Sequence, residues 1–470
     1  MLAWILRAVR LQSFSINTTH ADEGQLRDVF WCSVIAIVAS CQAVALPVGA
    51  AESQYPVGSA RVDITPDYPV RMNGFLVRKE ESRGVRQRIW AKALAIGDDT
   101  EGPLVLITVD NLGVPDEITH EVARRIGQSS KLRQERLAIA ASHTHTAPMI
   151  NGCAPNIFGA QIPPADQAHI DRYTQFFTDK LVEVGLAALD DRKPATMMFG
   201  VGKVTFAKNR RSATGPIDHE LPMLVVRDLN GQPRSILVNY ACHCVTLSES
   251  LIGGDWAGYA QEHIERIFPG SLAMVSIGCG ADQNPLLGVQ GDRFDIASQQ
   301  GLEIACEVKR LADGPLQTVS GKINVQYSRI DLDLAELPSR QELEQKSKLD
   351  SAIGYHARVQ LSKLDRGEKL RTKIDYPIQT WQFGDSLCMV FLAGEVVVDY
   401  AKRLKSEIPR ASIWVNAYSN AAPCYIPSER VLSEGGYEGG SAMIYYDQPT
   451  RFAPGLEEKI LGAVKQQLAR

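Results

Sequence analysis

The chain has 470 residues, of which 45% are hydrophobic, and carries 50 Lys and Arg against 54 Asp and Glu. This composition is typical of a globular protein with a large hydrophobic core, either one large catalytic domain or two to three average ones. The net charge is −4 and both signs are mixed along the chain, without a basic block or stripe. Nucleic acid is therefore not expected as a partner.

Residues 29–50 form an apolar stretch that ends in small residues before Glu52. This pattern is typical of an export signal with cleavage near Ala50. The segment "VASC", 38–41, resembles a bacterial lipoprotein box and would place a lipidated Cys41 at the mature N-terminus. An uncleaved anchor is a third interpretation, because about 20 apolar residues can span a bilayer. We expect 1–52 to be a signal region and the protein to be periplasmic or extracellular, with membrane contact through this segment or a lipid on Cys41.

Unbroken apolar runs alternate with segments of helical spacing in the rest of the chain. The runs predict buried strands at 103–110, 137–142, 235–241, 272–278, 387–394 and 412–418. The helical patterns lie at 166–191, with Asp166 as N-cap, and at 256–268, 339–349 and 455–469. Buried strands separated by helices predict an α/β fold, a layered sandwich of mixed, largely buried β-sheets flanked by helices. We expect a single catalytic domain over 53–470.

Polar side chains follow five of these predicted strands directly. They are Asp110 and Asn111, His143 and His145, His243, the segment 280–284, and Glu395. Open α/β sheets build their sites at the carboxyl ends of buried strands. The pattern therefore predicts one cleft that gathers these residues.

The first histidine motif lies in "ASHTHTAP", 141–148. Side chains two positions apart on a strand share a face, so His143 and His145 should point the same way. Two neutral imidazoles at one strand end suit a divalent metal ion, zinc first. The alternative is that one or both only form hydrogen bonds with backbone or water.

His243 stands between Cys242 and Cys244. Read locally, these residues suggest a soft metal site or a thiol nucleophile with its base, but strand alternation would place both thiols opposite the imidazole. We favour His243 alone as a cleft residue; a core histidine, or a nucleophilic Cys242 or Cys279, are the alternatives. The remaining cysteines do not form a disulfide framework.

Glu395 follows a hydrophobic strand and a glycine. A carboxylate is costly to bury there unless it is paired or bound to a metal ion, although a helix N-terminus would also stabilise it. The loop 421–446 is rich in glycine and tyrosine. Tyr425 and Tyr437 in this loop either donate phenol hydroxyls to a substrate or pack beneath it.

Ten motifs, taken in chain order, carry a resemblance to one family. They are "VGSARVDITP" (57–66), "MNGF" (72–75), "VDNLG" (109–113), "ASHTHTAP" (141–148), "KNRRS" (208–212), "VNYACHC" (238–244), "GDWAGYA" (254–260), "GCGADQNP" (278–285), "LAGE" (392–395) and "CYIPSERVLSEGGYEGG" (424–440). In this ordered set the chain resembles the neutral/alkaline non-lysosomal ceramidases. The resemblance implies a zinc amidohydrolase with one Zn²⁺ per chain, acting on a small N-acylated molecule such as ceramide or a related lipid.

The resemblance also implies roles for individual residues. The implied zinc ligands are His143, His243, Glu395 and Tyr425, and the implied catalytic or carbonyl-binding residues are His145, Tyr437 and Arg210. Zinc acidifies water and polarises a carbonyl, which suits amide hydrolysis. Further pocket candidates are Asp110 and Asp282, as acceptors that orient the ligating histidines, together with Gln283 and Asn284.

Two departures from the family pattern qualify the resemblance. The ceramidases carry a Gly-Asp-x-Ser-Pro-Asn motif whose serine has been proposed as a nucleophile, and 280–285 here has Gln283 and no serine. We also expect no C-terminal β-sandwich domain. The alternatives are a zinc hydrolase for another amide or ester, and a non-catalytic exported binding protein that keeps the fold.

Overall fold

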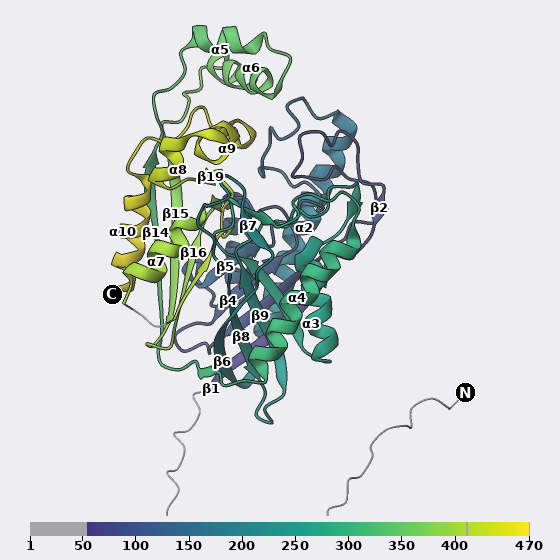
Figure 1. Cartoon of the computed structure of the whole chain (residues 1–470), viewed down its shortest axis with the longest axis vertical. Helices are drawn as coiled ribbons and strands as arrows, with labels where there is room; N and C mark the ends of the chain where they lie inside the picture. Colours follow the sequence, from purple (N-terminus) through teal and green to yellow (C-terminus); the bar gives the residue numbers. More distant parts are fainter. Residues whose placement is uncertain (1–53, 410–411, 470) are drawn as a thin grey trace, which may run out of the picture. The chain divides into compact units, whose positions relative to one another are not determined.

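Two mixed β-sheets lie face to face in this computed structural model, which describes residues 54–409 and 412–469 (Figure 1). The predicted export segment and Cys41 lie outside the described residues. Residues 51–470 form one compact unit. Within the described ranges, no helix combines the length and apolar character that crossing a bilayer requires.

The larger sheet has nine strands in the order β11-β9-β8-β6-β1-β3-β4-β5, with β13 beside β6. Its strands are β1 (Gln54–Asp63), β3 (Trp90–Ile96), β4 (Leu104–Val109), β5 (Leu137–Ala141), β6 (Lys193–Lys203), β8 (Glu220–Arg227), β9 (Pro233–Tyr240), β11 (Leu272–Ile277) and β13 (Gln317–Thr318). The pairs β4–β5 and β9–β11 are parallel, and the other pairs are antiparallel.

The second sheet has the order β14-β15-β16-β18. Its strands are β14 (Ile323–Asp333), β15 (Lys373–Phe383), β16 (Leu387–Leu392) and β18 (Ile413–Asn416). The pair β16–β18 is parallel, and the other two pairs are antiparallel. Three two-stranded pairs complete the strands: β2 (Gly84–Val85) with β10 (Leu251–Ile252), β7 (Ala207–Asn209) with β12 (Gln283–Pro285), and β17 (Glu395–Val396) with β19 (Tyr425–Ile426).

Large apolar side chains fill the space between the two sheets. Trp381, Phe391 and Trp414 of the second sheet share one buried cluster with Leu106 and Met274 of the first. Because helices cover the outer faces, most strands are buried on both sides and their sequences lack alternation. This explains why continuous apolar runs marked them in the sequence.

Helices flank both sheets, as Figure 1 shows for α3 and α4 on one side and α7 and α10 on the other. The helices are α1 (Asp116–Ser129), α2 (Pro164–Asp190), α3 (Asp255–Ile267), α4 (Phe294–Ala312), α5 (Arg340–Ser347), α6 (Ala352–Asp365), α7 (Val398–Glu407), α8 (Glu429–Glu434), α9 (Gly436–Gly439) and α10 (Leu456–Leu468), with 3-10 turns η1 (Gln134–Arg136) and η2 (Ser441–Tyr446). The predicted mixed α/β class is confirmed.

One local prediction is wrong. Helix α2 begins at Pro164, and its N-cap is Pro163 rather than Asp166. Asp166 lies in the first turn, where its carboxylate accepts a hydrogen bond from Arg71 Nε at 2.6 Å. An acidic side chain in the first turn is still favourable, because it faces the positive end of the helix dipole.

The segment that follows β18 closes the gap between two edge strands of the larger sheet. Ala141 N donates to Tyr418 O at 3.1 Å, and Ala417 N donates to Ile277 O at 2.9 Å. The carboxyl ends of β5, β11 and β18 therefore lie together. The same end of the molecule receives the loops that follow β9 and β16.

Candidate active site

His143 directly follows the segment that extends β5. Its backbone has a φ of 55°, in the left-handed region that non-glycine residues rarely adopt. Its ring lies 4.3 Å, centroid to centroid, from that of Tyr418 and is 1% exposed. Its Nδ1 lies 2.6 Å from the backbone oxygen of Leu112. Since a carbonyl oxygen only accepts, Nδ1 carries the proton and Nε2 presents a lone pair to the interior.

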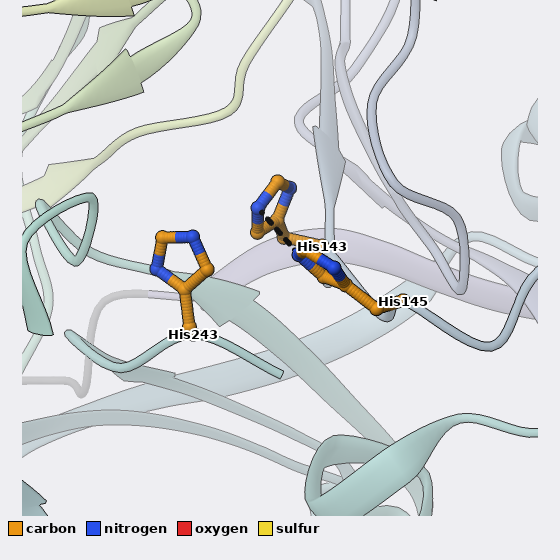
Figure 2. Close-up of side chains that lie close together, drawn as sticks. All are labelled: His143, His145 and His243. Carbon is orange, nitrogen blue, oxygen red and sulfur yellow. Dashed lines mark hydrogen bonds between the residues drawn. The ribbon is translucent and has the colours of Figure 1, made fainter. Parts of the chain in front are cut away.

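The same arrangement recurs at the other two histidines. His243 Nδ1 donates to the backbone oxygen of Gly280 at 2.8 Å, and His145 Nδ1 donates to that of Gly74 at 3.1 Å. Figure 2 shows His143 and His145 side by side, with His243 facing them from a separate segment. Their ligand nitrogens all lie within 4.8 Å of one another.

Glu395 and Tyr425 reach this cluster together because β17 and β19 pair in parallel with these two residues in register. Glu395 Oε2 lies 3.2 Å from His143 Nε2 and 3.3 Å from His243 Nε2. Tyr425 Oη lies 3.5 Å from His243 Nε2. Four side chains from separate segments, His143, His243, Glu395 and Tyr425, thus lie close together.

The cluster fits a bound cation on electrostatic grounds. Glu395 Oε2 is buried without a hydrogen bond, and the nitrogens nearest to it belong to rings whose protons point outward. The Nε2 atoms of His143 and His145 are 3.2 Å apart, a distance that needs a proton or a metal ion between two lone pairs. Backbone carbonyls that hold Nδ1–H are typical partners of histidines that bind metal through Nε2.

Burial disfavours protonation of His145 and His243. It lowers the pKa of His243 to about 4, with repulsion from Arg210 as the next cause. Burial, followed by the charges of His143 and His243, also lowers the pKa of His145 well below its usual 6.5. Burial alone would raise the pKa of Glu395, but the facing histidines hold it well below 4.5. A carboxylate oxygen beside imidazole nitrogens is a donor set that zinc accepts.

Arg210 lies beside the cluster and is held from two sides. Its Nε donates to Glu438 at 2.7 Å, and its Nη2 donates to Tyr425 Oη at 3.1 Å. Its Nη1 lies 3.3 Å from both His243 Nε2 and Asn284 Oδ1. The rings of Tyr425 and Tyr437 are 5.3 Å apart, centroid to centroid. The guanidinium is thus fixed where it can donate to a ligand above the histidines.

A pocket of about 680 Å³ opens above this group. Five predicted site residues line it: His145, Arg210, Asn284, Tyr425 and Tyr437. Apolar side chains supply part of the wall, namely Phe75, Leu76, Ile157, Val245 and Val289. A polar floor under partly apolar walls suits a substrate that joins a polar reacting group to an apolar portion.

Asp110 and Asp282, the predicted partners of the histidines, are both buried. Asp110 accepts hydrogen bonds from Trp90 N and Gln261 Nε2, and Asp282 accepts from Asn209 Nδ2 and Val398 N. Backbone carbonyls, and neither of these carboxylates, orient the histidines. The two aspartates instead join elements that carry the site.

Gln283, which stands at the position of the family serine, is fully buried. Its amide nitrogen donates to the backbone oxygen of Ala241, and its Oε1 accepts from Asp218 N at 2.7 Å. Its backbone oxygen accepts from His243 N at 2.9 Å. Gln283 therefore supports the loop of His243 and offers no nucleophile to the pocket.

The structure disfavours Cys242 or Cys279 as a nucleophile. Cys242 and Cys279 are fully buried, and burial raises the pKa of both thiols above the ordinary value of 9. A reactive cysteine needs an accessible thiolate stabilised by positive charge.

Sequence reasoning missed two side chains that contact the cluster: Tyr418, whose ring packs against that of His143, and Tyr446. Tyr446, at the end of η2, is partly buried and donates a short hydrogen bond to Glu395 Oε1. Burial, followed by the charge of Glu395, raises the pKa of Tyr446 well above 10, so it remains a donor. The only signal was its place in the tyrosine-rich loop, which does not distinguish it from Tyr445.

Comparison with known proteins gives one family. Residues 55–276 match the model of the neutral/alkaline non-lysosomal ceramidase N-terminal domain. The neutral ceramidase of Pseudomonas aeruginosa is 23% identical over 343 residues, which is 65% of this chain and 49% of the relative. The neutral ceramidase of Drosophila melanogaster is 22% identical over 293 residues, covering 55% of this chain and 40% of the relative.

Two solved structures share the fold. A ceramidase complexed with C2 superposes with a TM-score of 0.68 at 17% identity, covering 88% of this chain and 76% of the other. The neutral ceramidase of Pseudomonas aeruginosa gives a TM-score of 0.68 at 19% identity, with 88% and 75% covered. The matched part of the chain spans about half the length, or less, of the two curated relatives described above.

Proposed function

Because residues 55–276 belong to the neutral/alkaline non-lysosomal ceramidase family and the chain is a distant homologue of the neutral ceramidases, we propose that it is a zinc-dependent amidohydrolase. Its substrate is an N-acylated molecule, with ceramide or a related N-acyl lipid as the first class to test. The observation that carries this proposal is the buried Oε2 of Glu395, which has no hydrogen bond and faces the Nε2 lone pairs of His143 and His243.

We assign His143, His243, Glu395 and Tyr425 as the groups that hold the metal. Bound there, zinc would supply a Lewis acid that acidifies water and polarises a carbonyl oxygen. The carbonyls of Leu112 and Gly280 fix the two ligating rings in the required tautomer.

His145 handles protons on the pocket side. It lines the pocket, and its Nδ1–H is engaged by Gly74, so Nε2 is the nitrogen available to accept a proton from water. The protonated ring can then donate to the nitrogen of the departing amine, which leaves as a neutral molecule. One histidine of the H-x-H motif thus binds the metal ion, and its neighbour transfers protons.

Arg210 and Tyr437 bind the scissile carbonyl. Both line the pocket, and Glu438 holds Arg210 through Nε, which leaves its terminal nitrogens directed at the site. Donors fixed before the reaction stabilise the negative charge that develops on the oxygen of a tetrahedral intermediate. Gln283 has no role in bond breaking, so attack by water replaces a covalent serine route.

The test combines metal content with hydrolysis, on wild type, His143→Ala, His243→Ala and His145→Ala. We expect about one zinc per chain in wild type and its loss in the first two variants. His145→Ala should keep zinc but lose hydrolysis of a short-chain, water-soluble N-acyl substrate. A folded wild type that binds no zinc, or zinc lost equally from His145→Ala, would contradict these assignments.

Export remains a proposal about residues outside the described ranges. Mass spectrometry of the mature protein distinguishes cleavage near Ala50 from lipidation at Cys41, and an intact N-terminus would overturn both.

A further inference from the structure

The exposed apolar side chains of this protein concentrate at the mouth of the active-site pocket. Twelve large apolar or aromatic residues are exposed in the described ranges, and five of them lie on two turns that line this one pocket. We call these five the apolar rim: Leu76 and Val77 on one turn, and Leu286, Leu287 and Val289 on the other. Val77 is 82% exposed and Leu287 is 59% exposed.

The two turns are anchored, so their tips project from fixed bases. Arg78, next to Val77, is buried and donates through Nη1 to the backbone oxygens of Asn73 and His145, both at 2.7 Å. On the other turn, Leu286 N donates to Phe206 O and Gln290 N donates to Thr246 O. Exposed apolar side chains on rigid turns are not explained by packing within the chain.

A third segment extends this surface. Ala352, at the start of α6, and Leu76 both approach Gly159 so closely that a Cβ there would lie within 3.2 Å of each. Beside Ala352, Leu349 in the connection between α5 and α6 and Ile353 in the first turn of α6 are exposed. Two exposed lysines, Lys346 and Lys348, precede Leu349. The exposed Asp350 follows Leu349, so the apolar side chains, and not a positive charge, extend the surface here.

We propose that the apolar rim inserts into a lipid surface and presents the pocket to N-acyl lipids held there. This inference rests on the proposed function for its substrate, but not for its binding test. A lipid surface fits better than a flat protein partner, because the two turns also place Leu76 and Val289 in the wall of the pocket, so that whatever covers the rim faces the pocket as well. An acyl chain leaving a bilayer would pass from lipid to the apolar wall of Leu76 and Val289 without crossing water.

The first measurement is partitioning of the full chain onto phosphatidylcholine vesicles that contain no N-acyl lipid, with and without phosphatidylglycerol. The double variant Val77→Ser/Leu287→Ser should bind at least about tenfold more weakly than wild type, because two exposed apolar side chains are removed. The matched control is Val201→Ser/Leu229→Ser, which removes side chains that are 45% and 61% exposed outside the rim. The control should bind like wild type.

The second measurement reads the rim directly and does not depend on other membrane-binding segments. A tryptophan introduced as Leu287→Trp should be quenched by brominated lipid, whereas one introduced as Leu229→Trp should not. Equal quenching at both positions, or equal partitioning of rim and control variants, would overturn the proposal.

Measurements of hydrolysis on soluble and on vesicle-bound substrate test the membrane surface and the enzymatic function separately. The rim double variant should keep its activity on a short-chain, water-soluble N-acyl substrate and lose it on the same head group presented in vesicles. A protein that binds vesicles through the rim but hydrolyses neither substrate would refute the enzymatic proposal alone. A protein that hydrolyses the soluble substrate without rim-dependent binding would refute the membrane surface alone.

Discussion

Replacing Tyr446 by Phe removes one oxygen atom from the support of the metal site. The Tyr446 hydroxyl, on a partly buried side chain, donates to Glu395 Oε1, whose side chain is buried. No other donor to Oε1 is present among the described residues, so the variant leaves a buried carboxylate oxygen unsatisfied. We expect Tyr446→Phe to weaken zinc binding.

The size of the expected loss of zinc affinity follows from the negative charge of Glu395, which accepts this hydrogen bond. A hydrogen bond to a charged group contributes about 1.5–3 kcal/mol, and removal of a group that supports a metal ligand typically lowers metal affinity about 10- to 100-fold. The two ranges agree, since about 1.4 kcal/mol corresponds to a factor of ten. The hydroxyl is too small for its loss to disturb the fold by creating a cavity.

The assay is competition for zinc between the metal-free protein and a chelator of known affinity. Tyr445→Phe is the matched control, because Tyr445 is the adjacent residue, lines the pocket and has its ring 6.1 Å from that of Tyr437. Equal zinc affinities for the two variants would refute the role of Tyr446, and unfolding curves for both would show whether the fold is intact.

Two further predictions concern residues around the site. In Gly74→Ala, the added Cβ would lie 2.5 Å from His145 Nδ1, and Gly74 has a φ of 97°. We therefore expect kcat/KM to fall roughly 100-fold while the zinc content stays unchanged. Loss of zinc from this variant would show instead that His145 is a metal ligand. Burial raises the pKa of Asp255 from 3.8 to about 7, so the folded state retains a proton that the unfolded chain releases. The contribution of Asp255 to stability is therefore greatest below pH 4 and falls as pH rises to 7, by on the order of 4 kcal/mol, and Asp255→Asn should lack this loss. Urea unfolding at several pH values tests it, and parallel profiles for the two proteins would contradict it.

The sequence predicted six strands whose residues are almost all buried, but it did not predict β3 and β8, which are buried to a similar extent. Strands β4, β5, β9, β11, β16 and β18 were recognisable because both faces are covered, which leaves unbroken apolar runs. The long antiparallel strand β14 was not predicted, because most of its side chains are only partly buried and it lacks such a run. Its pairing with β15 depends on a partner about 50 residues later, which no local pattern encodes.

The sequence likewise predicted some residues of the candidate site and not others. Residues that follow buried strands, such as His143, His243 and Glu395, could be placed at one end of a sheet by topology alone. The roles of Asp110 and Asp282 could not be predicted, since a backbone carbonyl can orient a histidine as well as a carboxylate and leaves no trace in the sequence. Tyr446 was missed for the related reason that its contact depends on the path of a loop.

The geometry explains why the site has no compact motif. His143 follows β5 and His243 follows β9, two strands separated by five others in the larger sheet, while Glu395 and Tyr425 belong to a small strand pair joined to the second sheet. The ends of these strands meet only because the segment after β18 bridges β5 and β11. Packing of the two sheets therefore precedes completion of the ligand set. Metal binding at this site should consequently stabilise the whole two-sheet unit, because a ligand that binds only the folded state shifts the folding equilibrium.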